Sequence, residues 1–475
     1  MPSLIPISAR SFGPRHSQGM NALAPLSRPE LIAKYDGRAP RYTSYPTAAQ
    51  FTPAVDAATY RRWLAALPRS TSVSLYAHIP FCKRLCWYCG CNTRAVNRPE
   101  PIRDYAALLM QEIAMVREAL PGRLRAHAAH LGGGTPNMLQ PAEMDALFKA
   151  WREAFDLAPD AEISAEIDPA VLTRHWVSAA ALNGLNRASL GVQNLDPEVQ
   201  KAVNRRETFS EIEKAFGWLR EADVKSINVD LMYGLPSQTV DNTLSTIEAI
   251  LSLRPERLAL FGYAHVPWMK AHQRLIDEGA LPWPAERLAQ SEAAGERLTE
   301  AGYVQIGIDH FALPEDSLAK AAVAGELHRN FQGYTTEAGA ALIGFGASSI
   351  SSLPQGFVQN LSQEADWRKA VAAGDLPVSR GVALTDDDRF RGEIIERLMC
   401  DFEADLAAVC GRHGRALKDI AQELSRLPGL VHDGLAEWRE PVLKVTAAGR
   451  PVVRSICAIF DSHLQPGAGR HAKAI

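Results

Sequence analysis

Residues 76–92 read YAHIPFCKRLCWYCGCN, an apolar strand-like run that ends in a loop with four cysteines, Cys82, Cys86, Cys89 and Cys91. The other three of the seven cysteines are scattered along the chain. A zinc site would favour two separated cysteine pairs, or cysteines combined with downstream histidines, and the sequence has no second cysteine pair. Thiolates in one tight loop can instead hold three irons of a [4Fe–4S] cluster and leave the fourth iron open to a ligand. The loop therefore predicts an iron–sulfur site directly after a β-strand.

Outward from this loop the same pattern repeats: a short β-rich run ends in a polar or Gly-rich turn, and an amphipathic helical stretch follows. The six predicted strands are Ser72–His78, His127–Leu131, Glu162–Ile167, Ala188–Val192, Ile227–Met232 and Leu258–Tyr263. Successive βαβ units of this kind predict an α/β fold in which a parallel sheet curls into a barrel or partial barrel. An open doubly wound sheet is the alternative, but the dinucleotide fingerprint G-x-G-x-x-G is absent from the sequence.

Each predicted strand ends in a segment that could carry chemistry. These segments are the cysteine loop, Gly132–Gly134 with Thr135, Glu166 with Asp168, Gln193, Asp230, and Tyr263–His265. We expect them at one site, because the carboxyl ends of the strands form the active-site face of an α/β barrel. The glycines would offer backbone groups to a ligand, and the carboxylates of Glu166 and Asp230 suit ribose hydroxyls or an ammonium group. The alternatives are a simple tight turn for the glycines and helix-capping roles for the two acids.

The sequence predicts three parts: a disordered N-terminal arm (1–30), a catalytic domain (31–380), and a smaller, mostly helical C-terminal domain (381–475). Another βα-like passage runs through Val304–Phe311 and Leu342–Ser349. Thr385, followed by three aspartates, has the pattern of a helix cap with an acidic first turn. Two short strands at 435–438 and 442–446 and a last helix at 453–464 are expected beyond it.

Composition and charge exclude several classes of protein. The chain of 475 residues is 47% hydrophobic and 22% charged, and its net charge of −3 gives no basic footprint for nucleic acid. No apolar run approaches the ~18 residues of a membrane span, and no signal-peptide core is present at the N-terminus. We therefore expect a cytoplasmic protein that binds neither nucleic acid nor membrane.

The spacing C-x₃-C-x₂-C resembles the signature of radical S-adenosylmethionine (SAM) enzymes, which makes Cys82, Cys86 and Cys89 the expected ligands and Cys91 an additional thiol. Two further segments, RYTSYPT at 41–47 and HRNFQGYTT at 328–336, are far more specific. Together with the cysteine loop they resemble the oxygen-independent coproporphyrinogen III oxidases, from about Tyr35 to the end of the chain. The related haem chaperones share the barrel but lack these segments.

The resemblance implies a monomer with a curved partial barrel, a C-terminal domain that covers the site, one [4Fe–4S] cluster and two SAM molecules. An external reductase or flavodoxin-type protein would supply electrons. Carried over residue by residue, the expected SAM contacts are Tyr76, Tyr88, Gly133, Gly134, Thr135, Glu166, Gln193, Arg205, Asp230, Ala264 and Ile350. Tyr88 stands where the family commonly has phenylalanine. Arg41 and Arg329, from the two specific segments, are candidates for binding the substrate's carboxylates.

The implied reaction is oxidative decarboxylation of two propionates of coproporphyrinogen III, which gives protoporphyrinogen IX. Cleavage of SAM yields a 5′-deoxyadenosyl radical that takes a hydrogen from the propionate β-carbon, and loss of CO₂ and one electron leaves a vinyl group. Two alternatives remain open. A haem-degrading methyltransferase relative would turn over haem, and a haem-binding chaperone would keep the barrel without the reaction.

Overall fold

The computed structural model describes residues 26–336 and 341–464. Residues 1–25 of the predicted disordered arm lie outside this range, whereas its last residues belong to helix α1 (Arg28–Tyr35). Ser27 and Glu30 form a capping box at the start of α1, because the Glu30 carboxylate accepts from the Ser27 backbone N–H at 2.9 Å.

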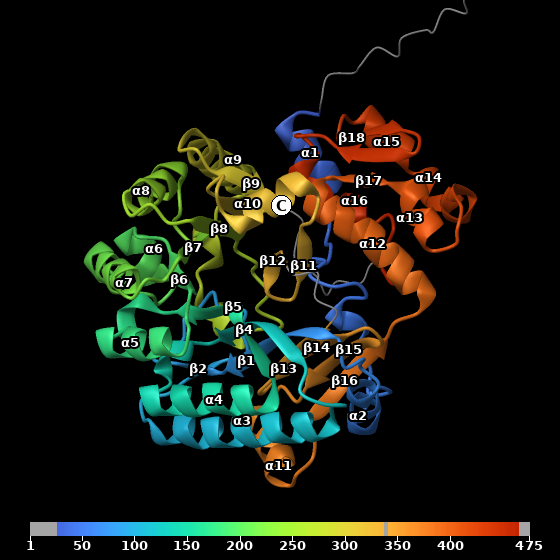
Figure 1. The fold of residues 1–475 in the computed structure, drawn as a ribbon. Coiled ribbons are helices and arrows are strands. Elements are labelled where there is room, and N and C mark those ends of the chain that lie inside the picture. Colours follow the sequence, from blue (N-terminus) through green and yellow to red (C-terminus); the bar gives the residue numbers. More distant parts are fainter. Residues whose placement is uncertain (1–25, 337–340, 465–475) are drawn as a thin grey trace, which may run out of the picture.

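A single sheet of twelve strands organises the molecule, in the order β16-β15-β14-β13-β1-β4-β5-β6-β7-β8-β10-β9. From β13 to β8 every neighbouring pair is parallel. The parallel strands are β13 (Ala341–Phe345), β1 (Ser72–Ile79), β4 (Arg125–Gly133), β5 (Asp156–Ile167), β6 (Arg187–Gln193), β7 (Ser226–Tyr233) and β8 (Arg257–Gly262). The sheet curves strongly, and within the described chain its edge strands β16 and β9 do not pair with each other (Figure 1). The predicted α/β partial barrel is therefore confirmed, with β13 as a seventh parallel strand.

Antiparallel strands extend both edges of this parallel core. On one side lie β14 (Ile350–Leu353), β15 (Gly356–Asn360) and β16 (Val378–Ala383), and on the other β10 (His310–Ala312) and β9 (Val304–Ile306). The passage 304–311 was expected to be βα-like, but it forms the two antiparallel strands β9 and β10. The turn between them needs Gly307, because a Cβ there would lie 2.0 Å from the Tyr334 ring and its φ is +54°. Two small separate sheets pair β2 (Phe81–Cys82) with β3 (Arg94–Ala95), and β11 (His328–Asn330) with β12 (Gly333–Thr335).

Helices cover the outer, convex face of the sheet (Figure 1). They are α2 (Ala57–Ala65), α3 (Glu100–Ala119), α4 (Pro141–Ala154), α5 (Arg174–Leu182), α6 (Pro197–Ala202), α7 (Phe209–Glu221), α8 (Val240–Leu251), α9 (Pro284–Glu300), α10 (Ser317–Ala324) and α11 (Glu364–Ala372). On α3 the predicted apolar face is buried at Leu109, Ile113 and Val116. These side chains join the main apolar core between helices and sheet, which leaves the carboxyl ends of the strands free to carry the site.

The C-terminal part consists of α12 (Asp386–Asp401), α13 (Leu406–Arg412), α14 (Ala421–Leu424), α15 (Leu427–His432), α16 (Val453–Cys457) and a small sheet of β17 (Glu403–Asp405), β19 (Val442–Val445) and β18 (Ala436–Arg439). The cap predicted at Thr385 is confirmed: its hydroxyl accepts from Asp388 N, and the Asp388 carboxylate accepts from Thr385 N. The last helix was expected to reach 464 but ends at Cys457. Beyond it the backbone N–H of Ser462 donates to the Tyr45 hydroxyl at 3.0 Å, a partner outside any helix.

The N-terminal segment packs with this C-terminal part. Leu31, Tyr42 and Tyr45 belong to the same buried apolar cluster as Phe390 of α12 and Phe460. Figure 1 shows α1 beside β18 and α16. Strand β16 crosses residue 380, so the main sheet continues past the expected end of the catalytic domain.

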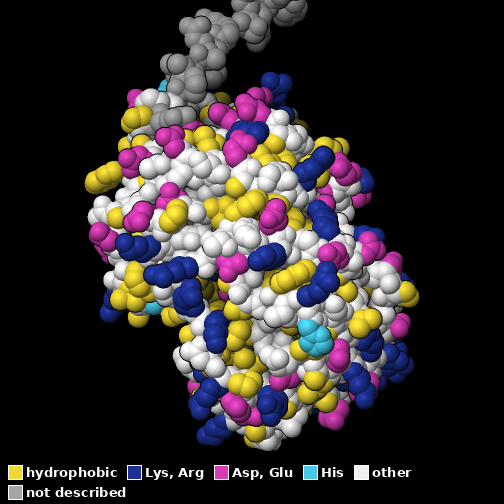
Figure 2. Space-filling view, turned by 90° about the vertical axis from the view of Figure 1, so that its left-hand side faces the viewer, with side chains coloured by type: hydrophobic (Ala, Val, Ile, Leu, Met, Phe, Trp, Pro, Cys, Tyr) yellow, Lys and Arg dark blue, Asp and Glu magenta, His cyan; other side chains and the backbone are white. Residues whose placement is uncertain are grey.

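None of the described helices is long and apolar enough to cross a membrane. On the face that carries α5 to α8, positive and negative side chains are intermixed (Figure 2).

Candidate active site

The cysteine loop leaves the sheet at the carboxyl end of β1 and is closed by the short strands β2 and β3. Two hydrogen bonds fasten its ends, from Arg94 N to Pro80 O at 3.0 Å and from Val96 N to Cys82 O at 2.9 Å. Cys82, Cys86 and Cys89 are half-buried, and Cys91 is exposed. All four thiols are free of disulfides.

Side chains from distant segments hold the backbone of this loop. His272 contacts Cys89 O at 2.7 Å, Lys270 donates to Cys91 O at 2.9 Å, and Gln273 donates to Tyr88 O at 2.9 Å. From another side, Asn204 donates to Leu85 O at 2.9 Å. The contacts from 270–273 could not be predicted from the sequence, because the segment 266–281 has no apolar periodicity. Their effect is to fix the loop's conformation while leaving its sulfur atoms available.

The donor set fits an iron–sulfur cluster, because it consists of three half-buried thiols from one loop and such clusters prefer thiolate ligands. In a [4Fe–4S] cluster each thiolate binds a different iron. The thiol of Cys82 already has a polar neighbour, Thr93 Oγ1 at 3.1 Å, and Cys89 Sγ accepts from Cys91 N at 3.4 Å.

The glycines at the end of β4 lie against the cysteine loop. Gly133 has φ +112°, and a Cβ there would lie 2.6 Å from the His78 ring. A Cβ on Gly134 would lie 2.5 Å from Thr93 Oγ1 and 2.7 Å from Phe81 O. Gly134 N also donates to Ile79 O at 2.9 Å, and Thr135 N to Phe81 O at 2.7 Å. Close packing against the cysteine loop therefore requires glycine at both positions, whether or not a ligand binds beside them.

Glu166, at the end of β5, lies beside these glycines. Its carboxylate accepts from Gly133 N at 2.8 Å and lies 3.6 Å from His130 Nε2. Burial opposes ionisation, but the contacts with His130 and Gly133 outweigh it and lower the pKa of Glu166. Tyr76 stacks on the His130 ring with centroids 5.8 Å apart. His130 was not among the predicted residues, although its position two residues before Gly132 puts it on the same face of β4.

Asp230, on β7, differs from Glu166 in the direction of its pKa shift. Burial, and then the nearby Glu166 charge, raise the pKa of Asp230 to about 6. Ser189 and Asn228 donate to its carboxylate at 2.9 and 2.8 Å and partly oppose this shift. A ligand hydroxyl or ammonium group could replace solvent at these oxygens.

Arg205 links the end of β6 to the cysteine loop. Its guanidinium donates to Gly191 O and pairs with Glu207, and it contacts Cys86 Sγ at 3.6 Å and Tyr88 OH at 3.3 Å. Glu207 was not predicted, and burial raises its pKa to about 8. Gln193, the last residue of β6, has a φ of +68°. A Cβ on Gly191 would lie 3.0 Å from Gln193 Nε2. The contacts of Arg205 therefore bring it together with Tyr88, another predicted SAM contact, and with Cys86, a predicted cluster ligand.

The remaining predicted residues occupy the same rim. Ala264 lies two residues beyond the end of β8, and its carbonyl accepts from Gln273 at 3.3 Å. Because Gln273 also donates to Tyr88 O, its side chain links Ala264 to Tyr88. Ile350 begins β14, which runs antiparallel to β13, and therefore lies at the end of the sheet where β13 finishes.

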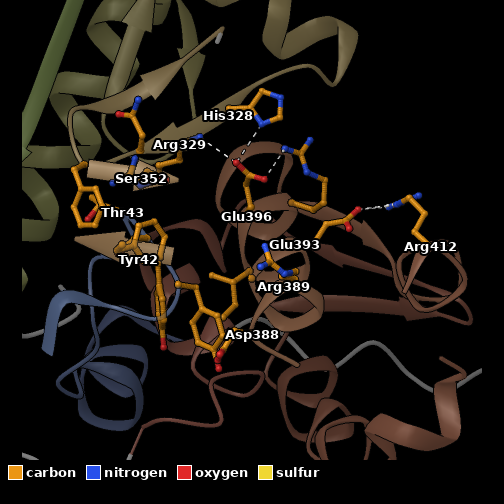
Figure 3. A pocket seen from close by; sticks show the side chains of 18 of the residues that line it. Tyr42, Thr43, His328, Arg329, Ser352, Asp388, Arg389, Glu393, Glu396 and Arg412 are labelled. Atoms are coloured by element: carbon orange, nitrogen blue, oxygen red, sulfur yellow. Dashed lines mark hydrogen bonds and ion pairs between the residues drawn. The ribbon is translucent and has the colours of Figure 1, made fainter. Parts of the chain in front are cut away.

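The two predicted substrate arginines lie on the side where the N-terminal and C-terminal segments meet. Arg41 donates to Gly262 O at 3.4 Å, at the end of β8. The Arg329 guanidinium lies 4.3 Å from the centre of the Tyr334 ring. Arg329 also lines a cavity of about 650 Å³ between the family-specific segments, β14, β15 and α12 (Figure 3). Ser352 and Phe357 line it from the sheet, and Glu396 and Arg389 from α12.

Comparisons with known proteins agree with this geometry. The model of the radical SAM superfamily matches residues 76–250. The chain is 49% identical over 449 residues to the oxygen-independent coproporphyrinogen III oxidase of Bradyrhizobium diazoefficiens, a match that covers 94% of this chain and 100% of that protein. It is 39% identical over 439 residues to the protein of the same name from Escherichia coli, with 92% and 96% covered.

The fold is also that of a solved structure. The coproporphyrinogen III oxidase from Escherichia coli, described as a radical SAM enzyme, superposes with a TM-score of 0.86 at 38% identity. The match covers 89% of this chain and 98% of that one.

Proposed function

Because the chain belongs to the oxygen-independent coproporphyrinogen III oxidases of the radical SAM superfamily, we propose that it converts coproporphyrinogen III to protoporphyrinogen IX by oxidative decarboxylation of two propionates. The observation that carries this proposal is the nearly end-to-end match at 49% identity, which spans the barrel and the C-terminal part together. It makes the chain an oxidoreductase of anaerobic haem biosynthesis.

Cys82, Cys86 and Cys89 would hold one [4Fe–4S] cluster, and SAM would bind at its open iron. When bound, the cluster supplies the electron for reductive cleavage of SAM, and SAM supplies the species that removes hydrogen from the substrate. We assign no ligand role to Cys91, whose backbone N–H already donates to Cys89 Sγ and whose side chain is exposed. A fourth protein ligand would close the iron that SAM must reach.

The chain's own residues would bind and orient SAM. Glu166 is held ionised by His130 and Gly133 N–H, so it can accept hydrogen bonds from SAM at the end of β5. Asp230 would do the same at the end of β7. The other proposed contacts are Tyr76, Tyr88, Gly133, Gly134, Thr135, Gln193, Arg205, Ala264 and Ile350. Two SAM molecules would share this rim, one at the cluster and one beside it.

Electrons would come from an external reductase or flavodoxin-type protein, and the enzyme would act as a cytoplasmic monomer that binds neither nucleic acid nor membrane. Arg41 and Arg329 would bind substrate carboxylates, because a tetrapyrrole with four carboxylates needs cations near the site.

The test is anaerobic turnover of coproporphyrinogen III deuterated at the propionate β-carbons, after cluster reconstitution, with SAM and a reductant. We expect vinyl product, one CO₂ and at least one SAM consumed for each vinyl group, and deuterium in 5′-deoxyadenosine. S-Adenosylhomocysteine or a methylated tetrapyrrole would instead indicate a methyltransferase. Stoichiometric haem binding without vinyl product in cluster-replete protein would indicate a chaperone.

A further inference from the structure

Guanidinium groups from three distant segments gather at the carboxyl end of β8. Arg41, in the N-terminal segment, donates to the carbonyl of Gly262, the last residue of β8. Arg454, on the C-terminal helix α16, donates through Nη1 to Ala39 O at 3.4 Å, two residues before Arg41 in the chain. Helix α16 is therefore tied to the segment that carries Arg41 to the end of β8.

Arg329 approaches this group from the hairpin of β11 and β12. Its guanidinium lies over Tyr334, whose ring meets the His310 ring edge-on with centroids 5.3 Å apart. The Nε and Nη1 atoms of Arg329 are buried and have no hydrogen-bond partner. Buried donors without a partner are costly, so these two N–H groups are placed to receive an acceptor from a ligand.

Asp309 is a carboxylate whose charge interacts with all three cations. It lies directly before β10, with its carboxylate 2.7 Å from His310 Nδ1, and its side chain is 16% exposed. Burial opposes its ionisation, but His310, Arg329 and Arg41 outweigh burial and lower the pKa of Asp309. Burial and the charge of Arg41, with a smaller contribution from Arg329, lower the pKa of Arg454 to about 10, although Asp309 partly opposes this. The groups therefore lie close enough to interact.

This cluster adjoins both the rim and the cavity. The His310 ring packs against Phe261 of β8 at 5.6 Å, and its charge acts on Asp230. Arg329 is also part of the cavity wall shown in Figure 3. An anion at the arginines would thus sit beside the proposed SAM site, with space for a large molecule next to it.

We propose that Arg454 joins Arg41 and Arg329 in binding propionate carboxylates of the tetrapyrrole substrate, with Asp309 and His310 holding the arginines in place. The C-terminal domain then contributes directly to substrate recognition as well as covering the barrel. This inference rests on the proposed function and adds to it a residue and a role for α16. The geometry suits carboxylates because guanidinium groups bind them through paired N–H donors.

The first experiment measures binding of coproporphyrinogen III, under anaerobic conditions and without reductant, to cluster-loaded wild-type enzyme and to Arg454→Gln. We expect the variant to bind at least about tenfold more weakly, while iron content and SAM affinity stay unchanged. Arg454→Lys, which keeps the charge, should recover part of the affinity. Arg439→Gln is the matched control, because Arg439 lies on β18 with its side chain 85% exposed. Binding by Arg454→Gln within twofold of wild type would overturn the inference.

A second measurement uses the unaltered protein and so does not depend on the variant folding. Phenylglyoxal modifies accessible arginines, and the modified positions can be mapped by mass spectrometry with and without coproporphyrin III as the stable probe. We expect the probe to protect Arg454 and Arg41 but not Arg439, and unprotected Arg454 would contradict the assignment. If wild-type enzyme bound no tetrapyrrole at all, the proposed function itself would fail, and the inference with it.

Discussion

Two regions of the molecule are built in opposite ways. One is the barrel rim, where the parallel strands end, and the other is the cap, which residues 26–46 form with residues 386–464. At the rim, strands β4 to β8 each pair with the next strand in the chain, so neighbours in space are neighbours in sequence. The cap joins residues 26–46 to residues 386–464. There Tyr42 OH donates to Asp461 at 2.9 Å, and Tyr45 OH lies 3.0 Å from Ser462 Oγ, across more than 400 residues of chain.

This difference separates two tasks. The rim repeats one local unit, and each unit delivers one chemically useful residue to the same edge of the sheet. The cap brings the two ends of the described chain together and ties Arg454 to the segment that carries Arg41 to the end of β8. The rim therefore suits a cofactor site shared by many relatives, whereas the cap suits recognition of one substrate. Changes in the two regions should accordingly have different consequences.

The largest effect is expected at the rim, from serine in place of Cys82, Cys86 or Cys89. Each substitution removes a proposed thiolate ligand, so the reconstituted protein should lose most of its iron, its cluster absorption and all detectable SAM cleavage. Cys91→Ser is the matched control in the same loop and should keep the cluster. Iron analysis and absorption spectra check the result. Loss of the cluster in Cys91→Ser with retention in Cys82→Ser would reverse the assignment.

The same difference explains what could be predicted from sequence. All six predicted strands are present, because each has local β-pattern and a turn that ends it. The helix predicted at 453–464 was wrong beyond Cys457, where Ser462 N donates to the Tyr45 hydroxyl, a partner far away in sequence, and not to a helix carbonyl. His272 and Gln273 were missed for the same reason, since only the folded chain brings them to the cysteine loop. Arg205 and Ile350 came from the family resemblance and not from any local pattern.

A second rim prediction compares Gly133→Val with Gly134→Val. At Gly133 the new side chain meets His78 and adopts a φ of +112°, so SAM cleavage should be abolished while most of the iron remains. At Gly134 it would strike Thr93 and Phe81 O, within the cysteine loop itself, so cluster assembly should fail as well. Iron content and SAM cleavage are measured on both variants. Normal SAM cleavage by Gly133→Val would mean that the glycines form only a turn.

An intermediate effect is expected at Glu112, which ties the parallel strands to the antiparallel edge. Its carboxylate accepts from Gly346 N at 2.7 Å, Asn360 Nδ2 at 2.6 Å and Trp367 Nε1 at 3.1 Å. Burial raises the pKa of Glu112 from 4.5 to about 7. An acid with a raised folded-state pKa stabilises the fold most at low pH, and this contribution is lost as pH rises from about 4.5 through 7.

The loss should approach ~3 kcal/mol by pH 8, from the difference between the two pKa values. Wild-type Tm should therefore fall by a few degrees more between pH 5 and pH 8 than the Tm of Glu112→Gln, which cannot titrate. In Glu112→Gln an amide NH₂ group would face the Asn360 donor and could not accept its hydrogen bond. The variant should therefore be the less stable protein at pH 5. Equal pH dependence in the two proteins would show that Glu112 is not the titrating group.

The smallest effect is expected in the cap region formed by the two ends of the described chain, from Thr385→Ala at the start of α12. The hydroxyl of Thr385 accepts from Asp388 N at 3.1 Å, and loss of such a cap costs about 1 kcal/mol. Amide exchange in α12 should accelerate about fivefold, because 1 kcal/mol corresponds to roughly that factor in local opening. Exchange in α3, iron content and SAM cleavage should stay unchanged, since the residues described above at the rim make no hydrogen bond to Thr385. Thr299→Ala is the control, because its hydroxyl donates to Gly295 O within α9 and caps no helix end. Equal acceleration in α3 and α12 would mean that cap and rim open as one unit, and the separation between them would not hold.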